Sequence, residues 1–120
     1  MIKEVVNERM GALGLPYAYW EYRSMRGKPA TLYFVGERIE APQTQEDGAR
    51  SGTFVLSGWS RNGIAPLDEA EEKIRAEFDD MRVSSALGAC TVSYSHASEV
   101  PSDVEGMCRV EFTLDYKEWS

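Results

Sequence analysis

The clearest structural signal in the sequence is residues 107–116, MCRVEFTLDY, because apolar and polar side chains alternate from Cys108 to Tyr116 without a break. Successive side chains of a β-strand point to opposite faces of a sheet. The apolar face would hold Cys108, Val110, Phe112, Leu114 and Tyr116, and the polar face Arg109, Glu111, Thr113 and Asp115. A strand with one buried face and one wet face is typical of an antiparallel sheet.

Four other segments predict strands, at 17–25, 31–40, 52–60 and 89–96. The last of these places Cys90, Val92, Tyr94 and His96 on one face. We expect it to form an antiparallel hairpin with 107–116 across a loop at 97–106. Matching the apolar faces puts Val92 opposite Phe112, Tyr94 opposite Val110, Cys90 opposite Leu114 and His96 opposite Cys108.

Two helices are expected outside the strands. One covers 1–13, and its apolar stripe is Ile2, Val6, Met10 and Leu13. The other begins at Pro66, and its stripe is Leu67, Ala70, Ile74, Phe78 and Met81. The sequence therefore predicts one α+β domain over 1–120, with a mostly antiparallel sheet of about five strands and two helices packed on it.

The charge balance excludes some partners. Twenty acidic residues against 13 basic ones leave a formal net charge of −7. An acidic surface repels nucleic-acid phosphates, although Arg23, Arg26 and Lys28 after an aromatic segment keep single-stranded nucleic acid as an alternative. No apolar run approaches the roughly 20 residues that span a bilayer, and no signal peptide is expected.

No catalytic, cofactor or metal site is expected. Cys90 and Cys108 have no zinc-ligand spacing, and we expect two reduced, buried thiols. His96 is the only histidine, and no serine has the local signature of an activated nucleophile. We expect it near a strand end and half exposed. A small enzyme centred on His96 stays as one alternative function.

Two features exceed what a monomeric core requires. The first expected strand is aromatic on both faces, with Tyr17 and Tyr19 opposite Trp20 and Tyr22. The stretch 41–50 is a long polar loop without a large hydrophobe. Tyr and Trp are enriched where proteins bind each other. The candidate subunit-interface residues are therefore Tyr17, Tyr19, Trp20, Gln43, Thr44, Gln45, Glu46, Asp47 and Trp119.

The chain resembles the small tail-completion proteins of long-tailed phages and prophages, the tail terminator or head–tail joining group. The resemblance runs from about Trp20 to Trp119. It is carried by YFVGE at 33–37, TQEDG at 44–48, TFVLSGW at 53–59, LDEA at 67–70 and VEFTL at 110–114.

The resemblance implies a non-enzymatic virion protein without a cofactor, which waits in the host cytoplasm before assembly. It implies a ring of identical subunits, commonly a hexamer, that caps the tail tube where the head connector meets it. DNA would pass through without specific binding, and no membrane would be involved. The alternative from another class is a small cytosolic homo-oligomeric interaction module.

Overall fold

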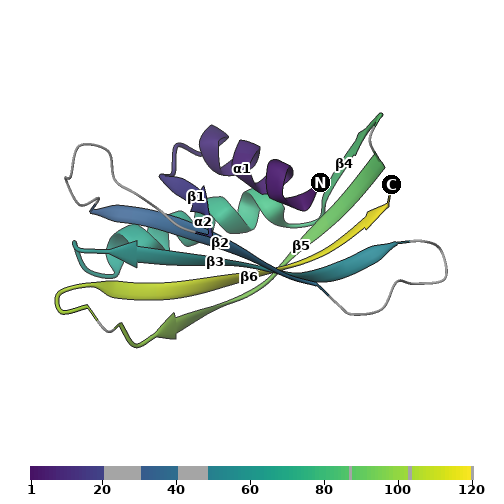
Figure 1. Cartoon of the computed structure of the whole chain (residues 1–120). Helices are drawn as coiled ribbons and strands as arrows, with labels where there is room; N and C mark the ends of the chain where they lie inside the picture. The colour runs from purple at the N-terminus through teal and green to yellow at the C-terminus, as the bar shows by residue number, and fades with distance from the viewer. Residues whose placement is uncertain (21–30, 41–48, 87, 103, 120) are drawn as a thin grey trace.

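The structure is a computed structural model, and it describes residues 1–20, 31–40, 49–86, 88–102 and 104–119. Its elements, in chain order, are α1 (Ile2–Ala12), β1 (Tyr17–Tyr19), β2 (Leu32–Glu40), β3 (Arg50–Ser60), α2 (Ala65–Phe78), β4 (Met81–Ser85), β5 (Gly88–Val100) and β6 (Cys108–Trp119). The strands form one twisted sheet in the order β1-β2-β3-β6-β5-β4 (Figure 1). Both helices lie on the same face of it.

The predicted α+β class is confirmed. Every neighbouring pair of strands is antiparallel except β1 with β2, which is parallel. The sheet has six strands where the sequence predicted about five, because β4 was not expected. Neither helix has the length and apolar character of a membrane-spanning segment among the residues described.

The core lies between the helices and one face of the sheet. The fully buried members of the two helical stripes are Ile2, Val6, Met10, Leu67, Ile74 and Phe78. They meet the predicted apolar face of β6, on which Phe112 and Leu114 are also fully buried. The ring centroids of Phe34 and Phe112 lie 6.0 Å apart. Burial of this apolar surface is what holds the two layers together.

Two glycines make room for the large core side chains. A Cβ on Gly58 would lie 2.7 Å from Phe34 Cε2 and 2.9 Å from Leu67 Cδ2. A Cβ on Gly36 would collide with the hydroxyl of Tyr17 and lie 2.8 Å from Phe54 Cε1. Both positions are buried, so the aromatic rings occupy the space that any other residue would need.

The helix α2 ends earlier than its apolar stripe predicted. Asp79 is already extended, with a ψ of 117°, and Asp80 has a φ of +51°. Met81 is therefore the first residue of β4, and it reaches the core from a strand instead of a helix. Ser84 and Ser85 form the end of this strand.

The predicted register of the last hairpin is wrong. Val92 lies opposite Tyr116 and Tyr94 opposite Leu114, four residues from the predicted partners. Cys90 lies opposite Glu118, and Cys108 pairs with Ser60 of β3 instead of His96. The strand β5 continues to Val100, so the turn is shorter than the predicted 97–106 loop.

Because of a β-bulge, His96 does not lie where the sequence predicted it. The pairing shifts by one residue between Tyr94 and His96, after which Ala97 lies opposite Phe112. An extra residue reverses which side chains face the core. His96 is therefore exposed in the middle of β5, and not half exposed at its end on the face of Tyr94.

The first strand and the two cysteines agree with the predictions only in part. The first strand covers Tyr17–Tyr19, and residues 21–25 of the predicted range lie outside the described residues. Trp20 ends the strand with a φ of +70°. Both cysteines are free thiols as predicted, but Cys90 is buried and Cys108 only half-buried.

Candidate functional site

The face of the sheet opposite the helices carries an aromatic row across three strands. Tyr33 on β2 lies opposite Trp59 on β3, and their rings are stacked, with centroids 6.1 Å apart and 13° between the planes. Trp59 in turn lies opposite Arg109 on β6, whose guanidinium carbon is 4.7 Å from the indole centroid. An Arg over a Trp face is a favourable cation–π contact. The three side chains thus contact one another within a single copy of the chain.

Arg109 is held in place by a neighbour on its own strand. Its Nη2 donates to Oε1 of Glu111 at 2.9 Å, and the two side chains are 27% and 36% exposed. Its Nε is buried and finds no hydrogen-bond partner among the described residues. The charges of Arg109 and Glu111 thus offset each other on a half-exposed surface, where an ion pair contributes little to the stability of the fold.

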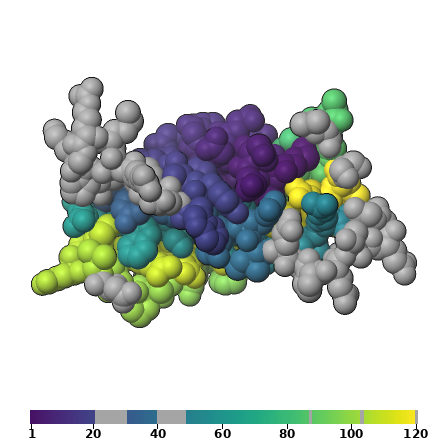
Figure 2. Space-filling view, in the orientation of Figure 1, coloured from purple at the N-terminus to yellow at the C-terminus, as the bar shows by residue number. Residues whose placement is uncertain are grey.

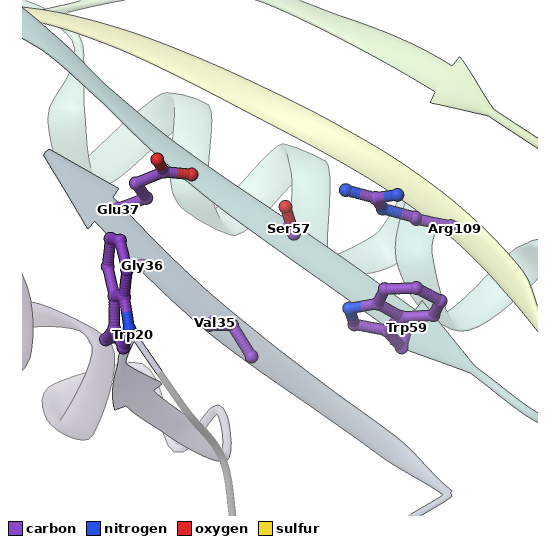
Figure 3. A pocket seen from close by; sticks show the side chains of 7 residues that line it. All are labelled: Trp20, Val35, Gly36, Glu37, Ser57, Trp59 and Arg109. Carbon is purple, nitrogen blue, oxygen red and sulfur yellow. The ribbon is translucent and has the colours of Figure 1, made fainter. Parts of the chain in front are cut away.

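A shallow depression of about 260 Å³ opens beside this row (Figure 3). Its lining is contributed by Trp20, Val35, Gly36, Glu37, Ser57, Trp59 and Arg109. Trp20 stands at one margin, where its backbone N–H donates to the Gly36 carbonyl at 2.7 Å. It is 68% exposed, the largest exposure among the large hydrophobic residues of the described chain. The site offers flat aromatic surface with one ion pair, which suits contact with another protein.

The described residues show neither a metal-binding cluster nor a serine triad around His96. They contain no cluster of three or more His, Cys, Asp or Glu side chains that could hold a metal ion. His96 Nδ1 lies 2.9 Å from the hydroxyl oxygen of Ser95, its neighbour in the chain. Within the described part of the chain no carboxylate contacts this imidazole, and a serine triad requires one.

Burial perturbs several groups on the helix side of the sheet. It raises the pKa of Tyr17, with a smaller contribution from Tyr19, and the Tyr17 hydroxyl finds no hydrogen-bond partner within the described ranges. Burial, and secondarily the Glu118 carboxylate, raises the pKa of Cys90 to about 11. The Cys90 thiol is therefore protonated at neutral pH and a poor nucleophile.

Three of the predicted interface residues lie together. Tyr17 and Tyr19 are half-buried. The Tyr19 ring lies tilted against that of Phe54, with centroids 6.1 Å apart and 40° between the planes, and the Lys3 ammonium is 5.2 Å from the Tyr19 centroid. Trp20 follows, with its ring centroid 6.4 Å from that of Tyr19. The two tyrosines thus pack against the core with part of their surface, and only Trp20 is largely exposed.

The other predicted interface residues lie elsewhere. Trp119 ends β6 beside Ala89, far along the sheet from the depression, with the Lys117 ammonium 5.1 Å from its ring. Gln43, Thr44, Gln45, Glu46 and Asp47 lie outside the described residues. Sequence reasoning missed the row formed by Tyr33, Trp59 and Arg109. The alternation of 107–116 does place Arg109 on the polar face of the sheet. That Arg109 contacts Trp59 follows only from the register of β3 with β6.

No protein-family model matches the chain, and no curated protein matches it. Several solved structures share its fold, among them the following two. One bears no functional name; it has a TM-score of 0.73 and 17% identity, over 99% of this chain and 94% of that one. The other belongs to the virion of a native gene transfer agent particle, with a TM-score of 0.73 and 14% identity, over 93% of this chain and 84% of that one. At these identities the likeness shows the fold.

Proposed function

We propose that this chain is a structural protein of a phage or prophage virion, which completes or caps the tail at the head–tail junction by forming an oligomeric ring. The observation that carries the proposal is the fold itself, which nearly the whole chain shares with a protein of the gene transfer agent virion. The sequence resemblance to tail-completion proteins supports the same role from independent features of the chain.

The exposed surface agrees with a role in assembly. Trp20 and Ile39 are 68% and 52% exposed, and Trp20 borders the aromatic depression on the helix-free face. Large apolar side chains gathered on one exposed area mark sites of protein–protein contact. A ring subunit needs such surfaces, whereas a monomer does not.

The charge of the chain agrees with a conduit for DNA. A formal net charge of −7 gives each subunit a field that repels phosphate. A ring of such subunits would let the duplex pass without holding it. The same property disfavours the alternative of single-stranded nucleic-acid binding.

The experiment is a mass measurement by light scattering, with the protein alone over a range of concentrations and with purified tail tubes. A closed ring of six copies of the 13.5 kDa chain would weigh about 81 kDa. Electron micrographs should show rings, or tube ends capped by the protein. A protein that stays monomeric and leaves tube ends bare would contradict the proposal. Closed oligomers that ignore tube ends would favour the cytosolic interaction module.

A matched pair of variants sharpens this experiment. Trp20→Ala removes an aromatic side chain that is 68% exposed, without touching the core, so ring formation should weaken while the melting temperature stays unchanged. Glu105→Ala, in the exposed turn before β6, is the control and should assemble like the wild type.

A further inference from the structure

Each outer edge of the sheet has a step, because in the described part of the chain the outermost strand pairs with only part of its longer neighbour. At one edge β4 pairs only with Gly88–Val92 of β5. The rest of β5, from Ser93 to Val100, has no strand on its outer side within the described part of the chain. At the other edge β1 covers only Phe34–Gly36 of β2. Backbone N–H and C=O groups along such an edge are available to another strand.

The two steps match in height along the strands. Tyr17 pairs with Phe34, and the successive partners of Phe34 across the sheet are Gly58, Val110 and Glu99 of β5. Tyr17 and Glu99 are therefore level, which means that they lie on one line across the strands. Tyr19 is level in the same way with Ala97. The projecting strand β1 therefore stands at the height of the open stretch of β5. Through the same ladders β4 begins at the height of Glu40, beyond the end of β1.

The strand directions match too. Since β1 is parallel to β2 and three antiparallel steps lead from β2 to β5, β1 runs opposite to β5. A second copy placed beside the first in the same orientation would offer β1 as an antiparallel partner, the common type of strand pair. Figure 1 shows β1 and the free end of β5 at opposite margins of the sheet.

The low charge of these two edges favours their contact. Residues 17–19 carry no charged side chain, and Ser93–Val100 carries only Glu99. Copies of a chain with a net charge of −7 approach each other at least cost where neither is charged. Edge strands that must stay free usually carry lysines or prolines, and these two have neither. The β-bulge lies at Ser95 and His96, outside the three residues level with β1.

We propose that β1 of one copy adds to the open edge of β5 in the next, so that the sheets of neighbouring subunits join head to tail. The proposal deepens the ring function and rests on it. The joint uses a different edge of each partner, which is the kind of contact that repeats into a ring when its rotation closes. Figure 2 shows that the β5–β6 end, in yellow-green, projects past α1, in purple, and stays accessible from this side.

Two side chains would face each other across the joint. Ala18 is level with Val35, Ser57, Glu111 and then Ser98. Ala18 is half-buried and Ser98 is exposed, so both positions accept a longer polar side chain in the monomer. Directly opposed charges stabilise or destabilise a strand pair according to their signs.

The experiment is a charge exchange across the joint. The double variant Ala18→Lys/Ser98→Lys places two positive charges at every joint and should weaken assembly roughly tenfold or more. The double variant Ala18→Glu/Ser98→Lys places opposite charges there and should restore assembly to within about threefold of the wild type. The control Ala76→Lys, on the exposed side of α2, adds the same charge away from the joint and should have no effect.

Hydrogen exchange gives a second measurement. In the wild-type assembly the amides of Ser93–Val100 should exchange more slowly than in the monomer, because some of them gain partners. Rings that form equally well from both double variants would overturn the edge joint and leave the ring function standing. Dimers or open chains that follow the charge pattern would support the joint and contradict the ring. Wild-type protein that stays monomeric with tail tubes, without added protection, would overturn both.

Discussion

Gly58 is a residue at which a single methyl group decides the packing. Its missing Cβ leaves room for Phe34 and Leu67, and neither neighbour has open space to retreat into, because both are buried. Gly58→Ala should lower the free energy of unfolding by about 1–3 kcal/mol, the usual cost of overpacking a core. Urea denaturation measures the change.

Gly11 supplies the matched control for this prediction. It lies in α1, and apart from its chain neighbours and the adjoining helix backbone no atom lies within 4 Å of the place that an added methyl group would take. Gly11→Ala should therefore stabilise the protein by about 0.5–1 kcal/mol through the higher helix propensity of alanine. Equal effects of the two substitutions would show that packing around Gly58 is not limiting.

Cys90 makes stability depend on alkaline pH. Its pKa is raised from 9.0 to about 11 in the folded chain. Between these values the unfolded thiol ionises while the folded thiol keeps its proton, so stability is full below pH 9 and falls as the pH rises. From about pH 8 to about pH 10.5 the wild type should lose roughly 2 kcal/mol more than Cys90→Ala. Urea denaturation of both proteins at each pH tests this; parallel losses would exclude Cys90 as the cause.

Phe112 and His96 should differ sharply in their effect on stability. Phe112 is fully buried, and Phe112→Ala should cost about 3–5 kcal/mol. His96 is exposed and contacts Ser95, so His96→Ala should change stability by less than about 0.5 kcal/mol. Comparable melting shifts for the two variants would contradict this placement of His96.

At the scale of elements, α1 is tied to the sheet by one buried carboxylate. Oε2 of Glu118, near the end of β6, accepts the backbone N–H of Ile2 at 3.0 Å. A carboxylate at a helix N-terminus also interacts favourably with the helix dipole. Glu118→Ala should therefore cost about 1.5–3 kcal/mol, measured by thermal and urea unfolding. The control Glu71→Ala removes a pair with Arg75 on the surface of α2 and should cost about 0.5 kcal/mol or less.

The elements themselves followed closely from side-chain periodicity. Alternation in β6 and the apolar stripes of α1 and α2 predicted which residues are buried, because burial of one face drives each element to form. Register did not follow from the same pattern. A shift of four residues between β5 and β6 keeps the apolar faces matched, so alternation could not distinguish Tyr116 from Phe112 as the partner of Val92.

The turn between α2 and β4 was not predicted either, because the pattern of apolar residues does not determine the backbone angles at its end. The strand β4 exists because Asp80 adopts a positive φ that turns the chain out of α2, and Met81 has the same hydrophobic character in either element.

The candidate surface was predictable only in part. Trp20 was expected at an interface from its aromatic neighbours, whereas the stack of Trp59 on Arg109 depends on long-range pairing that composition does not encode.

At the level of the whole molecule, we expect the polar segment between β2 and β3 to matter for assembly and not for folding. Deleting residues 43–48 leaves five residues between the paired Glu40 and Gly52, a length that hairpin loops commonly have. Ala49, which is buried, is retained. We expect the deletion to change the free energy of unfolding by about 1 kcal/mol or less and to weaken ring formation or tail attachment.

Light scattering with tail tubes, beside circular dichroism of the same sample, measures both properties of the deletion variant. Unchanged assembly and attachment would remove this segment from the mechanism. Loss of the fold would show that residues 43–48 contribute to stability.

The central position of β6 in the sheet has a consequence for how the chain folds during synthesis. Because β6 is the last strand in the chain yet lies between β3 and β5, the strands made before it form two separate groups, β1–β2–β3 and β4–β5. Neither group can complete the core until residues 108–119 have left the ribosome. Pairing of β3 with β6 then closes a loop of about fifty residues, and such distant contacts form slowly. A nascent chain stalled before β6 should therefore remain sensitive to protease, and resistance should appear in one step once that strand emerges.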